Sequence, residues 1–320
     1  MNKKIKILAN DGIHDAGKKI LLENNFSIYD EKIPQEELIR YINKNNIEGL
    51  VVRSATKVTE EVIKKTNNLK IIGRAGVGLD NIDLKFAKEK DIHVFNTPHA
   101  SSQSVAELVF AHIFNTSRML NQANREMPIH GENNFKKLKK KYSKGIELKN
   151  KKLGIIGFGR IGQLVAKIGI GLGMEILAFD KYNNESIISL DFFNKKKIDF
   201  NIKTIELELL LKESDFISVH TPKLDKPILG KKEFEIMKNG VIIINSSRGG
   251  VVDEDELLKN ISNTKISAAG LDVFINEPLP NKKILINEKI STSPHIGAST
   301  KEAQKRIGIE IAQNIIKFFK

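Results

Sequence analysis

The sequence predicts an α/β protein with two domains, each built on a mostly parallel β-sheet that helices cover on both faces. The chain has 320 residues, a length that suits about two domains of ordinary size. Short apolar, β-branched segments alternate with helical patterns, and this order occurs twice along the chain. Hydrophobic residues make up 40% of the sequence, which is enough to bury a core.

The first α/β series ends near Pro98, where a proline interrupts the pattern. Strands are recognised by alternating apolar residues or by β-branched runs, and helices by apolar residues at helical spacing. The expected elements are, in order, the strand Lys4–Leu8, the helix Ile13–Asn24, the strand Gly49–Arg53, the helix Thr59–Asn67, and the strands Leu69–Ile72 and His93–Phe95.

A long helical pattern follows this break, from about Ser101 to Leu120. Its Ser- and Gln-rich start offers N-cap residues, and its apolar residues recur at helical spacing. A polar, Lys-rich connection comes next. Its densest basic run, Lys136 to Lys141, is typical of a loop.

The second α/β series begins at Lys152. Its expected segments are, in order, Lys152–Ile156, Ile161–Gly171, Glu175–Phe179, Ile205–Leu211, Phe216–Val219, Val241–Ile244, Glu254–Leu258 and Ile266–Ala269. Residues Asn183–Asn201 are polar and weakly patterned, so we expect an excursion from the sheet there. The chain ends with a helix from about Ser299 to Phe319, and Ser299 with Glu302 fits a capping box at its start.

The composition excludes several kinds of site. The chain has no Cys, so it has neither disulfides nor a Cys-based metal site, and we expect no metal. It has no apolar run of about 18 residues, so we expect no membrane span. The apolar stretch before Asn10 is too short for a signal peptide. We therefore expect a cytoplasmic protein.

The net charge of +13 by itself suggests nucleic acid as a partner. Only 8 of the 52 basic residues are Arg, however, and Arg is the residue that phosphate-reading and base-reading sites favour. The Lys residues are spread along the chain rather than gathered. We therefore expect no nucleic-acid partner.

A glycine motif joins the first strand of the second series to its first helix. Gly157, Gly159 and Gly162 form a G-x-G-x-x-G. Glycines here allow a tight turn, close approach of a pyrophosphate and close helix–strand packing, while the helix N-terminus offers unpaired N–H groups. Asp180 ends the next strand, where a carboxylate binds the ribose hydroxyls of NAD and repels the 2′-phosphate of NADP. The spacing predicts an NAD site, the alternative being a Gly-rich turn in some other α/β protein.

Three charged residues, Arg248, Glu277 and His295, follow strands of the second series, where ligands bind in open α/β sheets. Oxidation of an alcohol needs a base, and His295 suits this role because imidazole titrates near neutral pH. We expect Glu277 to hydrogen-bond the other ring nitrogen and Arg248 to hold a substrate carboxylate with its planar fork. Each residue alone has an ordinary explanation, such as a surface loop His, but their order on one nucleotide-binding scaffold favours catalysis.

Over nearly its whole length the sequence resembles a known family, the D-isomer-specific 2-hydroxyacid dehydrogenases. The motifs that carry the resemblance are, in order, VVRSATKVTEEVI (51–63), GRAGVGLDNID (73–83), NTP (96–98), GFGRIG (157–162), VHTP (219–222), SSRGGVVDEDEL (246–257), AAGLDVF (268–274), EP (277–278) and SPHIGASTKEAQ (293–304). The last motif is most like family members that act on 3-phospho-D-glycerate, since members acting on glyoxylate or lactate usually differ there.

The resemblance implies two domains with Rossmann-like and flavodoxin-like parallel sheets and a cleft between them. Residues 1–98 and 292–320 would form the substrate (catalytic) domain, and residues 99–291 the NAD-binding domain. It also implies a homodimer, with a tetramer as the alternative, whose interface is built by the long helix that starts near Ser101. One basic residue of the following segment would reach the partner's active site, the candidates being Lys136, Lys137 and Lys139. The alternative for any one of these is a solvated Lys run.

The resemblance also implies roles for individual residues. It makes Arg248, Glu277 and His295 the catalytic residues, with His295 as acid and base. Cofactor contacts carry over to Val77, Gly157, Gly159, Arg160, Ile161, Gly162, Asp180, Thr221, Pro222, Ser246, Ser247, Asp272, Gly297 and Ala298. Val77 stands where some relatives have Thr, so only a backbone contact is expected there.

The substrate side is implied in the same way. A phosphate needs cations, and Arg53 and Arg74 match family positions that face the cleft, with surface ion pairs as the alternative. The loops at Ser54 and at Ala75 and Gly76 would offer backbone N–H groups to the substrate carboxylate.

These expectations predict a phosphorylated hydroxy acid as substrate and NAD-dependent oxidation of 3-phospho-D-glycerate to 3-phosphooxypyruvate, the first step of serine biosynthesis. A hydroxypyruvate or glyoxylate reductase, or another D-2-hydroxyacid dehydrogenase, is the nearest alternative. An NAD-sensing binding protein, like the corepressors built on this scaffold, is an alternative of another class. Because the sequence stops at Lys320, directly after the last expected helix, we expect no C-terminal regulatory domain.

Overall fold

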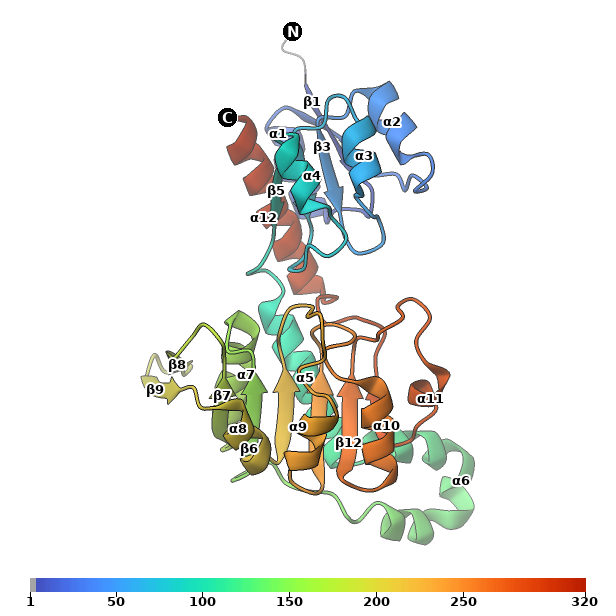
Figure 1. Cartoon of the computed structure of the whole chain (residues 1–320), viewed down its shortest axis with the longest axis vertical. Helices are drawn as coiled ribbons and strands as arrows, with labels where there is room; N and C mark the ends of the chain where they lie inside the picture. Colours follow the sequence, from blue (N-terminus) through green and yellow to red (C-terminus); the bar gives the residue numbers. More distant parts are fainter. Residues whose placement is uncertain (1–3) are drawn as a thin grey trace. The chain divides into compact units, whose positions relative to one another are not determined.

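The computed structural model describes residues 4–320, which fall into two compact units. The first unit comprises the residues up to Ser102 together with Ala298–Lys320, and the second comprises Gln103–Gly297. Each unit contains its own parallel sheet with helices on both faces (Figure 1). The expected α/β class is therefore confirmed.

The first unit is built on a five-stranded parallel sheet in the order β2-β1-β3-β4-β5. This flavodoxin-like order has a switch point beside β1, where consecutive connections leave to opposite faces. The strands are β1 (Ile5–Ala9), β2 (Phe26–Tyr29), β3 (Gly49–Val52), β4 (Ile71–Arg74) and β5 (His93–Asn96).

Two apolar cores cover the faces of this sheet. One core joins the strands to α2, α3 and α4, and the other joins them to α1 and α12. The last helix therefore packs on the first sheet. It also lies very close to α1, because a Cβ on Gly17 of α1 would lie 2.2 Å from the carbonyl oxygen of Gly308 of α12. The helices are α1 (Asp15–Glu23), α2 (Leu38–Asn45), α3 (Glu60–Lys65), α4 (Leu84–Glu89) and α12 (Lys301–Phe319).

The start of α12 corrects one expectation. Its N-cap is Thr300, whose hydroxyl accepts a hydrogen bond from the Ala303 N–H at 3.2 Å. The expected capping box, which began one residue earlier at Ser299, is wrong. In the observed frame the third helical position is Ala303, so no Glu side chain can return the bond to the cap.

The second unit is built on a six-stranded parallel sheet in the order β13-β12-β11-β10-β6-β7. Its switch point lies between β6 and β10, so the carboxyl ends of these strands flank a crevice of the kind that binds ligands. The strands are β6 (Lys152–Ile156), β7 (Glu175–Phe179), β10 (Phe216–Val219), β11 (Val241–Asn245), β12 (Ile266–Leu271) and β13 (Ile290–Thr292).

The strands of this sheet alternate between two cores. In β11, for example, Val241 and Ile243 face one core, while Ile242 and Ile244 face the other. The first core includes residues of α8 (Leu207–Glu213), α9 (Lys231–Ile236), α10 (Glu254–Ser262) and α11 (Lys282–Leu285). The second includes residues of α5 (Ser102–Ser117) and α7 (Arg160–Gly171). Burial on both faces is why these strands are continuously apolar.

The expected Lys-rich loop after α5 is wrong, because residues Leu120–Lys141 form the helix α6. Most of its residues are polar, so its sequence lacks the continuous apolar pattern that predicts a helix. Pro128 and a non-helical Asn134 also lie within it. Lys, Gln, Glu and Arg are nevertheless good helix formers, and their propensity outweighs these interruptions.

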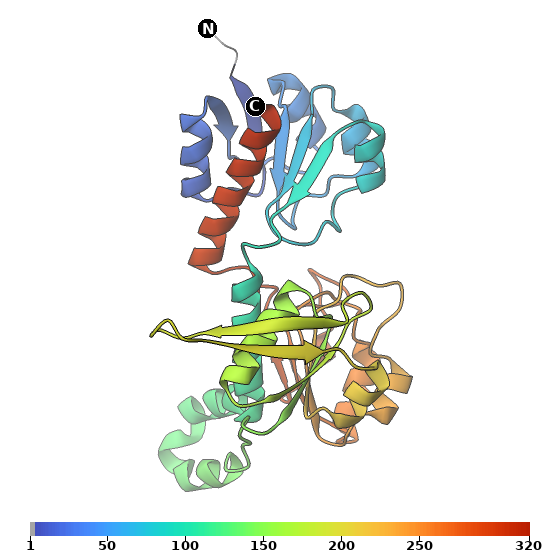
Figure 2. The same ribbon diagram turned by 90° about the vertical axis from the view of Figure 1, so that its left-hand side faces the viewer.

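Residues that were expected to leave the second sheet form an antiparallel hairpin, β8 (Glu185–Asp191) and β9 (Lys197–Lys203). It is a two-stranded sheet of its own and follows β7 (Figure 2). Its buried contact is Ile188, which joins the core beneath α7. Directly after the hairpin, Thr204 forms a parallel bridge to Ala178 of β7.

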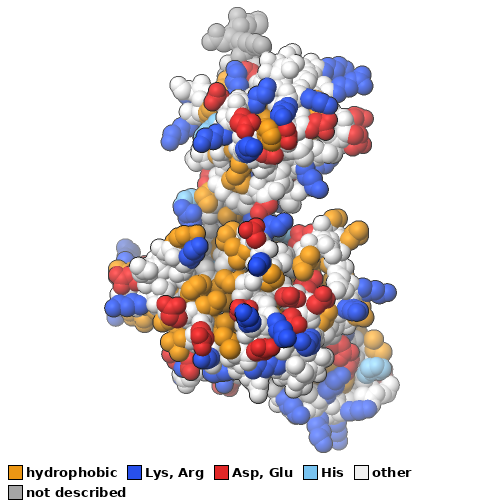
Figure 3. All heavy atoms as spheres, viewed as in Figure 1, with side chains coloured by type: hydrophobic (Ala, Val, Ile, Leu, Met, Phe, Trp, Pro, Cys, Tyr) orange, Lys and Arg blue, Asp and Glu red, His pale blue; other side chains and the backbone are white. Residues whose placement is uncertain are grey.

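Charged side chains are mixed over the surface. Lys and Arg are interspersed with Asp and Glu on the face shown in Figure 3. This agrees with the scattered Lys residues of the sequence. Among the helices of residues 4–320, none is long and apolar enough to cross a membrane.

Candidate active site

The predicted catalytic residues and most of the predicted cofactor residues gather at one edge of the second sheet. They follow all six of its parallel strands, whose carboxyl ends meet at the same edge. Gly157 to Ile161 follow β6, Asp180 follows β7, Thr221 and Pro222 follow β10, Ser246 to Arg248 follow β11, Asp272 and Glu277 follow β12, and His295 and Gly297 follow β13.

The glycine turn has the geometry that a pyrophosphate needs. Gly157 has φ +92°, and a Cβ there would lie 2.7 Å from the carbonyl oxygen of His220, at the end of β10. A Cβ on Gly162 would lie 2.2 Å from the Gly157 carbonyl oxygen, so the helix approaches the turn as closely as backbone allows. Gly159, the N-cap of α7, faces open space, with no atom within 4 Å of an added Cβ. An anion therefore has room at the helix N-terminus.

Asp180 fastens the glycine turn to the end of β7. One carboxylate oxygen accepts a hydrogen bond from the Phe158 N–H at 2.7 Å, and the other accepts from Tyr182 N at 2.8 Å and Asn183 N at 3.1 Å. A carboxylate has about four acceptor positions. Asp180 thus holds the turn while keeping capacity for a ribose hydroxyl.

Three buried polar side-chain atoms directly after β10 and β11 have no hydrogen-bond partner within residues 4–320. They are His220 Nδ1, Thr221 Oγ1 and Ser246 Oγ. Burial lowers the pKa of His220 to about 3, so its ring is neutral. Unpartnered buried polar atoms are costly, and here they gather beside the glycine turn. Together with the space over Gly159, they fit a polar dinucleotide such as NAD.

Arg248 is held by a turn that begins at the end of β11. The Asn245 side chain accepts from Ser247 N at 3.1 Å and Ser247 Oγ at 2.8 Å, and it donates to the Arg248 carbonyl at 2.9 Å. The next residue, Gly249, touches the loop after β12, since a Cβ there would lie 1.9 Å from the Phe274 carbonyl oxygen. These contacts bring Arg248 close enough to affect Glu277.

Glu277 and His295 form a hydrogen-bonded pair. Glu277 Oε2 lies 2.8 Å from His295 Nδ1, and Glu277 Oε1 accepts from the Phe274 N–H at 2.9 Å. Burial alone would raise the pKa of Glu277, but hydrogen bonds from His295 and Phe274 and the charge of Arg248 outweigh it and hold the pKa below its ordinary value. Glu277 is therefore a carboxylate that accepts the proton of Nδ1. The other ring nitrogen, Nε2, is then an available base.

Asp272 organises the loop that carries His295. Its buried carboxylate accepts hydrogen bonds from Ile296 N and Gly297 N, both at 2.8 Å, and its backbone carbonyl accepts from His295 N at 2.8 Å. His295 has φ +53°, in the left-handed region that non-glycine residues rarely occupy. A cavity of about 410 Å³ adjoins the pair and is lined by Phe274, Glu277, Pro278, Pro280, Leu285, Thr292, Ser293, Pro294 and His295.

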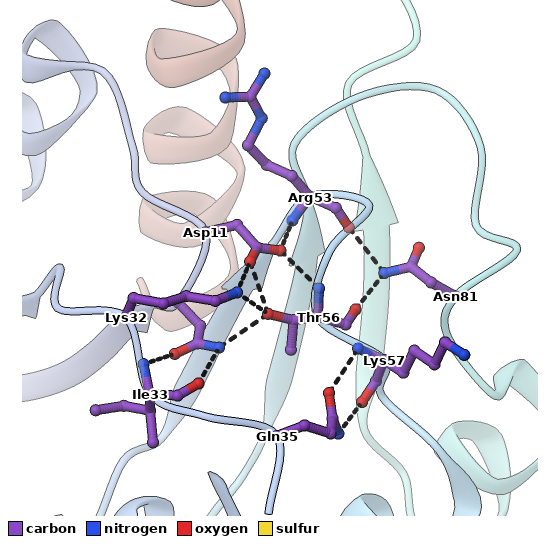
Figure 4. Close-up of polar contacts among 9 residues, drawn as sticks. Asp11, Lys32, Ile33, Gln35, Arg53, Thr56, Lys57 and Asn81 are labelled. Carbon is purple, nitrogen blue, oxygen red and sulfur yellow. Dashed lines mark hydrogen bonds and ion pairs between the residues drawn. The ribbon is translucent and has the colours of Figure 1, made fainter. Parts of the chain in front are cut away.

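The predicted substrate residues belong to the first unit, where Arg53 and Ser54 follow β3, Arg74 ends β4, and Ala75 and Gly76 follow it. The loop from Arg53 to Thr56 is tied to the end of β1 by Asp11, which sequence analysis did not identify (Figure 4). Asp11 accepts from Arg53 N at 2.7 Å, Thr56 N at 3.1 Å and Thr56 Oγ1 at 2.7 Å, and pairs with Lys32. Asn81 donates to the carbonyls of Arg53 and Thr56 at 2.8 and 2.6 Å.

The two candidate phosphate ligands differ in their surroundings. The Arg53 guanidinium points away from the network that holds its backbone (Figure 4). Arg53 lines a cavity of about 410 Å³ together with Asn10, Asp11, Gly12, Asp30, Lys32, Ser54 and Ala55. The Arg74 guanidinium instead folds over its own loop, where Nη1 lies 3.4 Å from the Ala75 carbonyl and 1.5 Å from where a Cβ on Gly76 would be.

Two predicted cofactor residues, Val77 and Ala298, belong to the first unit. The Val77 carbonyl accepts from the Asn96 side chain at 2.6 Å, and the Ala298 carbonyl accepts from Gln304 at 2.7 Å. The residues that sequence analysis missed, including Asp11 and Asn245, are polar residues at the ends of apolar strands. That position is a usable signal, because a buried polar side chain there must find partners in nearby loops.

Comparison with known proteins shows the family to which the chain belongs. Residues 110–297 match the family model described as "D-isomer specific 2-hydroxyacid dehydrogenase, NAD binding domain". Over 98% of both chains, the sequence is 41% identical to a hydroxypyruvate reductase of Thermotoga maritima. It is also 41% identical to a D-3-phosphoglycerate dehydrogenase of Methanocaldococcus jannaschii, over 98% of this chain and 57% of that one.

A similar solved structure contains bound NAD⁺. The NAD⁺-bound 3-phosphoglycerate dehydrogenase of Entamoeba histolytica superimposes with a TM-score of 0.78 at 27% identity, covering 99% of this chain and 96% of that one. The family match and this likeness confirm the expectation that the cofactor is NAD.

Proposed function

Because the chain belongs to the D-isomer-specific 2-hydroxyacid dehydrogenases, which are NAD-dependent oxidoreductases, we propose that it oxidises 3-phospho-D-glycerate to 3-phosphooxypyruvate. This reaction removes a hydride from C2 and a proton from the C2 hydroxyl. Bound NAD⁺ supplies the hydride acceptor. In this proposal the chain itself binds the substrate, orients it and takes the proton.

His295 is the proposed base. Its Nδ1–H is committed to the Glu277 carboxylate at 2.8 Å, which leaves Nε2 to accept the hydroxyl proton. The imidazolium that forms is stabilised by the same carboxylate. Arg248, on the neighbouring loop, is the proposed ligand of the substrate carboxylate, because its fork matches two carboxylate oxygens. We expect His295→Ala to abolish turnover while leaving NAD binding largely intact.

The choice of a phosphorylated substrate rests mainly on Arg53. Within residues 4–320 its guanidinium makes no hydrogen bond or ion pair, yet its backbone is fixed on both sides by Asp11 and Asn81. An arginine whose backbone is fixed and whose head lines a cavity is suited to binding an anion. Arg74 is proposed as a second phosphate ligand, although its guanidinium must leave its present contact with the Ala75 carbonyl to act.

Steady-state kinetics test the proposal that the substrate is a phosphorylated hydroxy acid. NADH formation is measured at alkaline pH with 3-phosphoglycerate, D-glycerate and D-lactate, with a trap for the keto product. Arg53→Gln should raise KM for the phosphorylated acid about tenfold or more, since a charge-assisted pair is lost. It should leave kinetics with D-glycerate nearly unchanged. Arg40→Gln removes an exposed charge from the same unit and serves as the matched control.

A hydroxypyruvate or glyoxylate reductase is the second candidate. The observation in its favour is the 41% identity to the Thermotoga hydroxypyruvate reductase over 98% of both chains. Turnover of hydroxypyruvate or glyoxylate with NADH, without turnover of the phosphorylated pair, would establish it and overturn our proposal. NADH-dependent capture of a partner protein without any dehydrogenase activity would instead support an NAD-sensing binding protein.

We further propose that the protein acts as a homodimer in the cytoplasm. Four apolar side chains of α6 are exposed within one chain: Leu120, Met127, Ile129 and Phe135 have 54, 41, 74 and 59% of their surface accessible. Covering them by a second copy would remove apolar surface from water. The end of the same helix carries Lys136, Lys137 and Lys139. That one of them reaches the partner's active site stays a prediction.

A further inference from the structure

A continuous row of hydrogen bonds runs from α5 to the loop that carries His295. Asn115 Nδ2 donates to Ser291 Oγ at 2.7 Å, and Ser291 Oγ lies 2.9 Å from His112 Nδ1. His112 Nε2 lies 2.9 Å from Ser293 Oγ. Ser293 Oγ donates in turn to Asp272 Oδ1 at 2.6 Å. All five residues belong to the second unit.

The chemistry of the end groups fixes the direction of every bond. A carboxylate only accepts, so the single hydroxyl proton of Ser293 goes to Asp272. Ser293 Oγ must then accept from His112, which places a proton on Nε2. In a neutral ring Nδ1 is therefore an acceptor, and it receives the hydroxyl proton of Ser291. Ser291 Oγ is left to accept from Asn115, so every bond in the row joins one donor to one acceptor.

The ring of His112 is enclosed and neutral. Only 4% of the residue is exposed, and it lies directly on β12, since a Cβ on Gly270 would be 2.6 Å from the His112 Cβ. Burial lowers the pKa of His112, and the charge of Asp272 only partly offsets this effect. A neutral ring with one donor and one acceptor is the form that the hydrogen-bond directions require.

The row ends on the group that holds the catalytic loop. Asp272 accepts from Ile296 N and Gly297 N and so fixes the two residues after His295, whose φ of +53° is strained. Such a conformation persists only where the surroundings over-determine it. A Ser293 hydroxyl aimed at Asp272 by His112 keeps the carboxylate in the one rotamer that serves both amides. Hydrogen bonds in a row of this kind polarise and strengthen one another.

We propose that His112 is a positioning residue for the dehydrogenase reaction. Through Ser293 and Asp272 it fixes the backbone of His295 and thereby the place of Nε2 relative to the substrate hydroxyl. Displacement of a catalytic group by about 1 Å costs up to about a hundredfold in rate. His112 touches neither substrate nor cofactor in this scheme. The inference rests on the proposed role of His295 as the base.

Two conservative variants of His112 distinguish the contribution of Nε2 from that of Nδ1. The amide of Gln reaches the place of Nε2 and can still donate to Ser293, whereas Asn reaches only the place of Nδ1. We expect His112→Asn to lower kcat about tenfold, with KM for the hydroxy acid and Kd for NADH changed less than twofold. His112→Gln should keep at least about half of kcat. Ser117→Ala removes a buried hydroxyl that donates to the Ile113 carbonyl within α5 and is the matched control.

Rates are expressed per NADH-binding site, counted by fluorescence titration, so that unfolded protein does not enter kcat. A purely structural role for His112 would lower the melting temperature and the number of sites but not this normalised kcat. Ser293→Ala should lower kcat similarly, and His112→Asn with Ser293→Ala should be no worse than Ser293→Ala alone, because both interrupt the same row. Normal kcat in His112→Asn, or additive losses in the double variant, would overturn the proposal.

His295→Asn is measured in the same series and separates the two assignments. If it loses turnover while His112→Asn keeps it, His295 stands as the base and the positioning role is refuted. If His295→Asn itself turns over at a near-normal rate, the base assignment fails, and the positioning role fails with it.

Discussion

Asp11 connects the end of β1 to the loop that carries Arg53, and the change Asp11→Asn tests how firmly this loop is held. Each carboxylate oxygen serves two donors. Oδ2 accepts from Arg53 N and Thr56 N, while Oδ1 accepts from Thr56 Oγ1 and pairs with Lys32. An Asn amide offers one acceptor in place of two. Whichever way it turns, one pair of donors faces an NH₂ group.

The size of the effect follows from which bonds are lost. The Asp11 side chain is only 5% exposed, so water cannot readily replace its bonds. Leaving a buried donor unsatisfied costs about 1–3 kcal/mol. The Lys32 pair adds little, because Lys32 is 57% exposed and screened by solvent. We therefore expect Asp11→Asn to lower the stability of the first unit by about 2–4 kcal/mol at neutral pH.

The same contacts predict how this difference depends on pH. Burial would raise the pKa of Asp11, but hydrogen bonds from Lys32, Arg53 N and Thr56 outweigh it and hold the pKa below the ordinary 3.8. A carboxyl whose pKa is lower in the folded state stabilises the fold fully above its unfolded pKa. That contribution is lost as the pH falls below 3.8 through the folded pKa. The wild-type advantage over Asp11→Asn should therefore shrink in this acidic range.

Denaturant unfolding followed by far-UV circular dichroism, at neutral pH and at several values below 3.8, measures both effects. Glu89→Gln, which removes an exposed charge at the end of α4, controls for the loss of charge alone. KM for the hydroxy acid is measured alongside, because a loosened loop should also misplace Arg53. A neutral-pH loss no larger than that of Glu89→Gln, or a difference that does not change on acidification, would refute the reasoning.

Three further outcomes are expected. Glu277→Gln should lower kcat about a hundredfold with little change in NADH affinity, because the carboxylate that stabilises the His295 imidazolium is lost; retention of kcat in stopped-flow and steady-state assays would contradict this. Gly162→Ala should weaken NADH binding at least about tenfold in fluorescence titration, since its Cβ would lie 2.2 Å from the Gly157 carbonyl oxygen. Gly171→Ala is the control and should leave NADH binding unchanged, because Gly171 faces open space at the end of α7. Mass photometry should give twice the chain mass of 36.0 kDa, and a monomer that remains active would argue against the α6 interface.

Local sequence was enough for the glycine turn and most elements around it. The strand Glu175–Phe179 has the same bounds in the structure as in the sequence-based prediction. Helix α7 begins at Arg160, one residue before its expected start. These predictions work because a strand buried on both faces must be continuously apolar and a nucleotide-binding turn must be glycine-rich. The order Arg248, Glu277 and His295 also pointed to one edge of the sheet, because parallel strands end at the same edge.

Elements without an apolar pattern were not found in this way. Helix α6 is mostly polar and its large apolar side chains are mostly exposed within one chain, so its sequence favours a helix by residue propensity, which apolar periodicity does not report. The start of α12 was misplaced because Ser299 and Thr300 are both good caps. Only the backbone geometry shows that Thr300 accepts the Ala303 amide proton.

Sequence alone thus determined the class of fold and the dinucleotide turn, and it supplied the residues proposed to do the chemistry. Tertiary structure decided which polar side chains come within hydrogen-bonding distance of one another. His112 and Ser291 are 179 residues apart, and Asp11 and Thr56 are 45 apart, yet each pair shares a hydrogen bond. Periodicity reports only that a side chain is buried or exposed. The partner of a buried polar group is set by packing between distant segments, because desolvation forces that group to bond with whatever the fold brings within reach.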